Sequence, residues 1–166
     1  MRIFSPPEIN QMCLEFLDRI NQFDFYLHDL FLNQYNTGLR YSDLYDLFRW
    51  EFVVPEIYLC HPAKGNSPRM FNNEELSFPF RESVRSNNSI YEVCRYTTTI
   101  RYFNRYFREP YIKVGRKEIS THIFRHNKAK QLKQQEWNDE QIRIYFGEQN
   151  IINTMGYIYS TVYTDD

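Results

Sequence analysis

The feature that most constrains the fold is one change of hydrophobic period in the middle of the chain. Apolar side chains recur at the three- and four-residue spacing of helices up to about residue 50. Residues 52–60 are instead rich in β-formers, and a turn with Gly and Pro at 64–68 leads into a short strand at 69–71. Helical spacing then returns. This pattern predicts a mainly α-helical fold with a small antiparallel β-sheet, of the α+β class.

Start and stop signals divide the helical parts. Ser5, Pro6, Pro7 and Glu8 are typical of a helix start, and Gly38 is typical of a helix end. The pattern predicts a first helix that begins at residue 5. It predicts further helices over residues 25–36, 42–50, 88–108, 121–135, 138–146 and 150–161. No repeat or internal boundary interrupts it, so we expect residues 1–166 to form a single domain, with no separate helical domain ahead of it.

Composition excludes several classes of protein. No apolar run approaches the roughly 20 residues of a membrane span, and the chain starts too polar for a signal peptide. The three cysteines, Cys13, Cys60 and Cys94, lack paired spacing, which indicates reduced thiols in a cytoplasmic setting. His122 and His126 are four residues apart without a nearby acid or cysteine to complete a zinc motif, so we expect no metal or other cofactor.

The charge distribution favours an anionic partner although the net charge is −1. Residues 1–80 hold 6 basic and 11 acidic side chains, residues 81–133 hold 13 and 4, and residues 134–166 hold 1 and 6. A basic middle between acidic ends suggests one positive face, as a phosphate backbone requires. Within it, Arg101, Arg105 and Lys128 are the candidate DNA contacts. The alternative is a solvated helix surface with arginine stems packed over aromatic rings.

Four segments carry the chemistry, and they stand in a fixed order. Residues 37–44 read TGLRYSDL, residues 63–69 AKGNSPR, residues 120–129 STHIFRHNKA, and residues 146–157 FGE followed by NTMGY. They resemble the arginine, β-hairpin lysine, H-x-x-R-H and tyrosine boxes of the tyrosine recombinase (phage integrase) family. Arg40 to Lys64 is 24 residues, and Arg125 to Tyr157 is 32, which agrees with the spacing in that family.

The resemblance implies the recombinase catalytic-domain fold and a site of Arg40, Lys64, His122, Arg125, Glu148 and Tyr157. Tyr157 would attack a phosphodiester and form a 3′-phosphotyrosine, and the two arginines would hold the phosphate oxygens. His122 suits proton transfer, and Lys64 could protonate the departing 5′-oxygen. The implied partner is double-stranded DNA, bound by a tetramer with an accessory domain or protein, in the nucleoid or in the host cytoplasm of a mobile element.

Two positions depart from the family pattern. Asp43 replaces a Glu, and Glu148 replaces the His or Trp that usually donates a hydrogen bond to the phosphate. We expect Glu148 to turn away from the site toward Lys128 or Arg143, although an inward orientation that slows the site is also open.

Other interpretations stay open at this stage. Tyr159 competes with Tyr157 as nucleophile, and the spacing from Arg125 favours Tyr157. A catalytically weakened or dead DNA-binding or assembly factor on the same scaffold is the main alternative function, because fold does not settle function. A topoisomerase-like relaxing enzyme would use the same residues. Each site residue alone is also compatible with an ordinary structural role.

Overall fold

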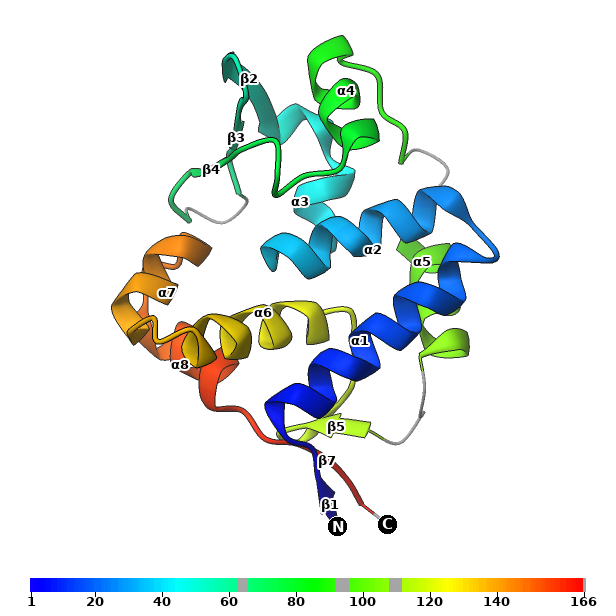
Figure 1. The fold of residues 1–166 in the computed structure, drawn as a ribbon, viewed down its shortest axis with the longest axis vertical. Coiled ribbons are helices and arrows are strands. Elements are labelled where there is room, and N and C mark those ends of the chain that lie inside the picture. Colours follow the sequence, from blue (N-terminus) through cyan, green and yellow to red (C-terminus); the bar gives the residue numbers. More distant parts are fainter. Residues whose placement is uncertain (63–65, 92–95, 108–111, 166) are drawn as a thin grey trace.

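A computed structural model describes residues 1–62, 66–91, 96–107 and 112–165 (Figure 1). The described elements are mainly helical with two small antiparallel sheets, which confirms the α+β class. Lys64 and Cys94 lie outside the described residues. Of the helices that the structure describes, none is both long and apolar enough to cross a membrane.

The predicted helices occur in order, together with one helix that the sequence pattern did not predict. They are α1 (Pro6–Asn21), α2 (Phe25–Thr37), α3 (Tyr41–Tyr45), the 3-10 helix η1 (Leu47–Arg49), α4 (Phe78–Ser86), α5 (Tyr96–Tyr106), α6 (Ile123–Gln134), α7 (Asp139–Phe146) and α8 (Ile151–Tyr159). Ser5 and Glu8 form the reciprocal capping box at the start of α1. Gly38 ends α2 in the left-handed conformation at φ +70°, and a side chain there would approach Phe146 to 2.7 Å. Glycine is therefore required for the turn and for space.

The first sheet lies beside α3 and α4. Its strands are β2 (Trp50–Val54), β3 (Ile57–Cys60) and β4 (Arg69–Phe71), all antiparallel in the order β2-β3-β4. The predicted β-rich segment is thus a hairpin of its own, turning at Glu56 with φ +69°, and residues 69–71 add a third strand.

The second sheet joins the two ends of the chain, and the sequence pattern did not predict it. Its strands are β1 (Arg2–Ile3), β5 (Ile112–Val114), β6 (Lys117–Glu118) and β7 (Val162–Thr164), in the order β1-β7-β5-β6. Figure 1 shows β1 and β7 side by side with both termini at this end of the molecule. The last predicted helix accordingly ends at Tyr159 rather than at residue 161.

Two other helix predictions were wrong in extent. The helix expected over residues 42–50 breaks after Tyr45, because the Asp46 side chain accepts a hydrogen bond from the backbone N–H of Phe48 and starts the 3-10 turn. The helix expected over residues 88–108 is wrong at its start, because residues 88–91 are not helical, and α5 covers Tyr96–Tyr106 of it. α4 lies before that range and was not predicted. The side-chain oxygen of the buried Asn33 accepts a hydrogen bond from the backbone N–H of Ser77 at 2.8 Å, which connects the start of α4 to α2.

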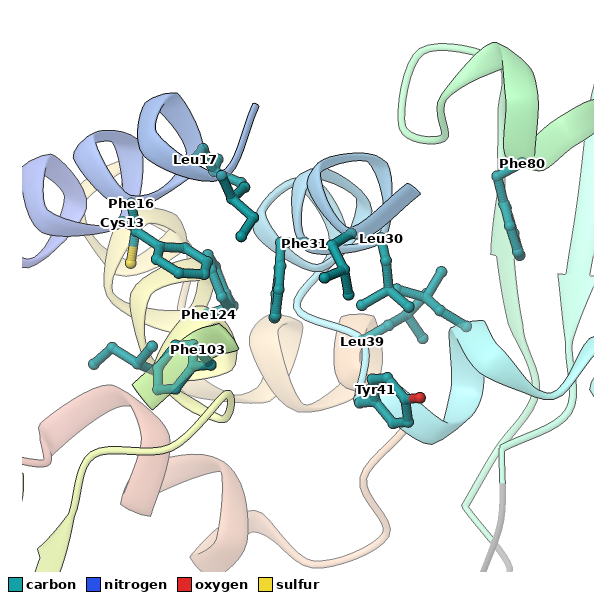
Figure 2. Close-up of a cluster of buried hydrophobic side chains, with 14 of the residues drawn as sticks. Cys13, Phe16, Leu17, Leu30, Phe31, Leu39, Tyr41, Phe80, Phe103 and Phe124 are labelled. Carbon is teal, nitrogen blue, oxygen red and sulfur yellow. The ribbon is translucent and has the colours of Figure 1, made fainter. Parts of the chain in front are cut away.

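An aromatic cluster fills the space between α1, α2, α5 and α6. Phe16 contacts Phe31 and Phe103 with ring centroids 5.0 and 5.3 Å apart, and Phe31 stacks on Phe124 at 5.6 Å (Figure 2). A second cluster joins α6, α7 and α8 through Ala129, Leu132, Ile142, Phe146 and Ile158. α6 takes part in both clusters, so the elements on either side of it are held in fixed positions.

Candidate active site

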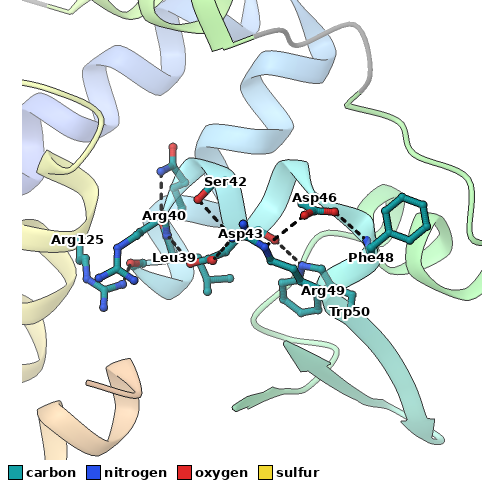
Figure 3. A network of polar contacts seen from close by, with 11 residues as sticks. Leu39, Arg40, Ser42, Asp43, Asp46, Phe48, Arg49, Trp50 and Arg125 are labelled. Atoms are coloured by element: carbon teal, nitrogen blue, oxygen red, sulfur yellow. Dashed lines mark hydrogen bonds and ion pairs between the residues drawn. The ribbon is translucent and has the colours of Figure 1, made fainter. Parts of the chain in front are cut away.

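Arg40 lies in the short connection between α2 and α3. The left-handed Gly38 reverses the chain, Leu39 is buried, and Arg40 becomes the N-cap residue of α3. The backbone N–H of Arg40 donates to the buried carboxylate of Asp43 at 3.4 Å, and Asp43 also binds the Arg49 guanidinium at 2.9 Å (Figure 3). This local network fixes the backbone of Arg40 and leaves its side chain 28% exposed.

Arg125 lies one turn into α6, beside Arg40 (Figure 3). Its guanidinium is almost fully buried and donates to the carbonyl oxygen of Gly38 at 2.9 Å. It also lies over the rings of Phe146 and Tyr157, at 4.5 and 5.0 Å from their centroids. Burial, and then the nearby charge of Arg40, lower the pKa of Arg125.

Glu148 joins the two arginines, contrary to the expected orientation. α7 ends at Gly147 in the left-handed conformation, and Glu148 follows with only 3% of its side chain exposed. Its Oε1 atom accepts from Arg40 at 3.0 Å and from Arg125 at 2.9 Å. Arg143 binds the backbone carbonyl oxygen of Glu148 at 2.7 Å and leaves the carboxylate to the site. The predicted outward orientation, with the carboxylate held by Lys128 or Arg143, is therefore wrong.

His122 and Tyr157 complete the group around one pocket of about 640 Å³. Its walls include the side chains of Arg40, Lys117, His122, Glu148, Asn153 and Tyr157. His122 is exposed at the pocket, where partial desolvation and then the charges of Arg40 and Arg125 lower its pKa and favour the neutral imidazole. A second pocket of about 840 Å³ adjoins the first and shares Arg40, Ser120 and His122 with it.

The two candidate tyrosines occupy different places. The Tyr157 ring packs edge-on against His126, with centroids 4.9 Å apart, and lines the pocket. The hydroxyl of Tyr159 donates to the carboxylate of Asp139 on α7, where its side chain is 55% exposed. Geometry therefore groups Tyr157 with the arginines and holds Tyr159 outside the pocket.

The candidate DNA contacts are not all alike. Arg101 and Arg105 are exposed on α5, each near the ring of the tyrosine that follows it. Lys128 is half-buried over the ring of Tyr145, and burial lowers its pKa. Lys128 is not among the residues that line the pocket.

Sequence reasoning missed Lys117, which lies on the β5–β6 hairpin and lines the pocket. The available signal was Gly115, which has φ +63° in the hairpin turn. Within the described part of the chain, no group of His, Cys, Asp and Glu side chains could hold a metal ion. What the arrangement can do is bind an anion between two guanidinium groups, next to a neutral imidazole and a phenol.

Comparison with known proteins adds no relative: no family model, no curated protein and no solved structure matches the chain.

Proposed function

We propose that the chain is the catalytic domain of a tyrosine recombinase, with the fold of that family, which cuts and rejoins DNA through a 3′-phosphotyrosine. One observation carries the proposal. Arg40 and Arg125, which are 85 residues apart in the sequence, bind one oxygen atom of Glu148, and Arg40, Glu148 and Tyr157 line the same pocket. That oxygen belongs to Glu148 and stands in for a phosphate oxygen. Double-stranded DNA is the proposed partner, bound by an assembly of several copies in the cytoplasm.

The reaction needs few groups. The Tyr157 oxygen attacks phosphorus, the new P–O bond forms, and the bond to the 5′-oxygen breaks. The phenolic proton passes to neutral His122 or to water, and a cation near the leaving oxygen supplies the proton that it needs. Lys64 was predicted for that step, and Lys117, at the edge of the pocket, is a second candidate. The reverse attack by a 5′-hydroxyl restores the DNA without ATP, because the phosphotyrosine keeps the bond energy.

Glu148 decides how active this site is. Its carboxylate occupies the space between the arginines, so a DNA phosphate must displace it before both guanidinium groups can bind. An ionised carboxylate also supplies no hydrogen-bond donor, and the loss of one such donor typically costs about 10²–10³ in rate. The inward Glu148 is the observation that favours the second candidate function, a DNA-binding or assembly factor on this scaffold that does not cleave.

A nicked suicide DNA substrate separates the two functions. The recombinase should accumulate a covalent protein–DNA adduct, detectable as a shifted band in a denaturing gel. Tyr157→Phe should abolish the adduct while folding and DNA affinity stay unchanged, and the matched Tyr159→Phe should retain it. DNA binding by the unmodified chain without any adduct would establish the second candidate and reject the first.

A further inference from the structure

Lys130 is a buried lysine whose partners all lie at the end of one helix. Its side chain is 5% exposed on α6. The ammonium group donates to the backbone oxygens of Tyr157 at 3.1 Å, Ile158 at 2.9 Å and Ser160 at 2.8 Å, and contacts the Ser160 hydroxyl at 3.1 Å. None of these oxygens is a carboxylate. The cation therefore binds the carbonyl oxygens with which α8 ends.

The end of α8 needs such a partner for a physical reason. The last carbonyl groups of a helix lack partners within it, and they form the negative end of its dipole. α2 and α7 end at a left-handed glycine, Gly38 and Gly147. α8 ends at Ser160 in an extended conformation, and Lys130 supplies the missing donors.

His126 makes a second contact to the same helix end from the same face of α6. Its Nδ1 atom lies 2.7 Å from the Ser160 hydroxyl, and its ring packs edge-on against the Tyr157 ring. α6 therefore holds Tyr157 at two points, the backbone carbonyl and the ring. Arg125 directly precedes His126 on this helix, so one rigid element sets the position of the arginine and of the tyrosine.

We propose that Lys130 is a positioning residue for Tyr157: by holding the end of α8 against α6, it fixes the place from which the tyrosine faces the pocket. Its relevance to cleavage rests on the proposed function. The attachment of the end of α8 to α6 through Lys130, called the clamp below, is a property of the fold. Lys130 touches neither the pocket nor a phosphate site, so its effect should appear in the rate of the chemical step and in the order of α8, not in DNA affinity.

The test compares Lys130→Met with Lys133→Met. Lys133 is the next lysine on α6, 39% exposed, paired with Asp139 and 5.8 Å from the centre of the exposed Tyr159 ring, so it is the control for losing a lysine that meets only the outer side of α8. Amide hydrogen exchange over residues 151–159 should be roughly tenfold faster in Lys130→Met and should change much less in Lys133→Met. The adduct rate at saturating DNA should fall about 10–100-fold in Lys130→Met, with unchanged DNA affinity, because small misplacements of a reacting group are costly. Lys130→Arg, which keeps the charged donor, should restore part of the rate.

Three results would overturn the proposal: unchanged exchange of α8, faster exchange with a full adduct rate, or equal effects of the two methionine variants. Should Lys130→Met fail to fold, Ser160→Ala replaces it, since it removes the hydroxyl that contacts both Lys130 and His126 and should give smaller changes of the same kind. Should the unmodified chain form no adduct, the proposed function fails. The clamp is then judged by exchange and by a fluorine-labelled Tyr157, whose resonance should move in Lys130→Met and not in Lys133→Met.

Discussion

Replacing Glu148 with Gln tests whether the space between the two arginines is an anion site. The substitution keeps the size of the side chain and one carbonyl oxygen, and it removes the negative charge. In the native chain that charge lies 2.9 Å from the Arg125 guanidinium, with both side chains at most 3% exposed. Without it, two guanidinium groups stay close together with only a neutral acceptor between them.

The expected loss of stability follows from burial. A hydrogen bond to a charged group contributes about 1.5–3 kcal/mol, and Gln keeps an acceptor, so Glu148→Gln should lose an amount near the lower end of that range. The contact to Arg40 adds at most about 1 kcal/mol, because that side chain is 28% exposed and its charge is screened. Glu148→Ala removes the partner outright and should cost about 3–5 kcal/mol. Since domains are stable by about 5–15 kcal/mol, the Gln variant should stay folded.

Sulfate is the probe, and urea unfolding is the measurement. An anion that displaces the neutral amide of the Glu148→Gln variant from between the arginines stabilises the folded state by about 2.7 kcal/mol at 100 times its dissociation constant. In the native chain the Glu148 carboxylate competes for the same arginines, so the gain should be smaller. Sulfate also stabilises proteins in general by exclusion from their surfaces. Glu140→Gln, which breaks the surface pair with Arg143, measures that general effect.

Equal gains from sulfate in the native chain, Glu140→Gln and Glu148→Gln would refute the reasoning, because no anion would then bind between the arginines. In the suicide-substrate assay, Glu148→Gln and Glu148→His should both form adduct faster than the native chain. Slower adduct formation in both variants, with stability intact, would give Glu148 a positive role in the reaction.

Burial lowers the pKa of His126 to about 3. Between pH 7 and pH 5 His126 therefore becomes protonated in the unfolded state but not in the folded state, and the unfolding free energy should fall by about 2 kcal/mol. His126→Asn should flatten that decline in urea titrations, and a parallel decline would contradict the assignment. Replacing Arg101 and Arg105 with Ala should weaken duplex binding to all sequences alike and lower the slope of log K against log salt by about 0.9 for each lost phosphate contact; an unchanged slope would remove α5 from the interface. Gly38→Ala should cost more than about 1 kcal/mol, because its left-handed backbone and the close Phe146 both exclude a side chain, whereas Gly156→Ala in α8 meets nothing within 4 Å and should gain about 0.5–1 kcal/mol in thermal unfolding.

The sequence predicted the elements that depend on interactions between residues close together in the chain. The cap at Ser5, the stop at Gly38 and the periods of α6, α7 and α8 all lie within a few residues of their predicted places. α4 was missed although Ser77 and Pro79 repeat the signal of the first helix. The second sheet left no pattern to find, because its strands are two or three residues long and its pairing joins opposite ends of the chain.

The candidate site divides in the same way. Spacing grouped Arg40, His122, Arg125 and Tyr157, and the structure brings these residues together around one pocket and its buried wall. The orientation of the Glu148 side chain could not be predicted, because it depends on where Arg143 donates its hydrogen bond. Arg143 donates to the backbone oxygen of Glu148 and not to its carboxylate. The burial of Lys130 could not be predicted either, since a lysine on a helix gives the same sequence pattern whether it faces solvent or a neighbouring helix end.

Three buried cations in and around the candidate site bind helix ends in the same way, and this bears on the choice between the two candidate functions. Arg125 binds the carbonyl of Gly38 just after α2, Arg69 binds the carbonyl of Thr37, the last residue of α2, and Lys130 binds the end of α8. Helix ends of this kind make buried cations tolerable, because the carbonyl dipoles replace the water that the cations lose. A protein that had given up cleavage would still need these contacts in order to fold, so the presence of Arg125 alone does not favour an enzyme. Arg40 is different: its side chain has no such carbonyl contact among the described residues, only Glu148. The contact with Glu148 is therefore all that Arg40 contributes to the fold through its side chain among the described residues. The strongest structural argument for a phosphate site is this partly exposed arginine, not the buried Arg125.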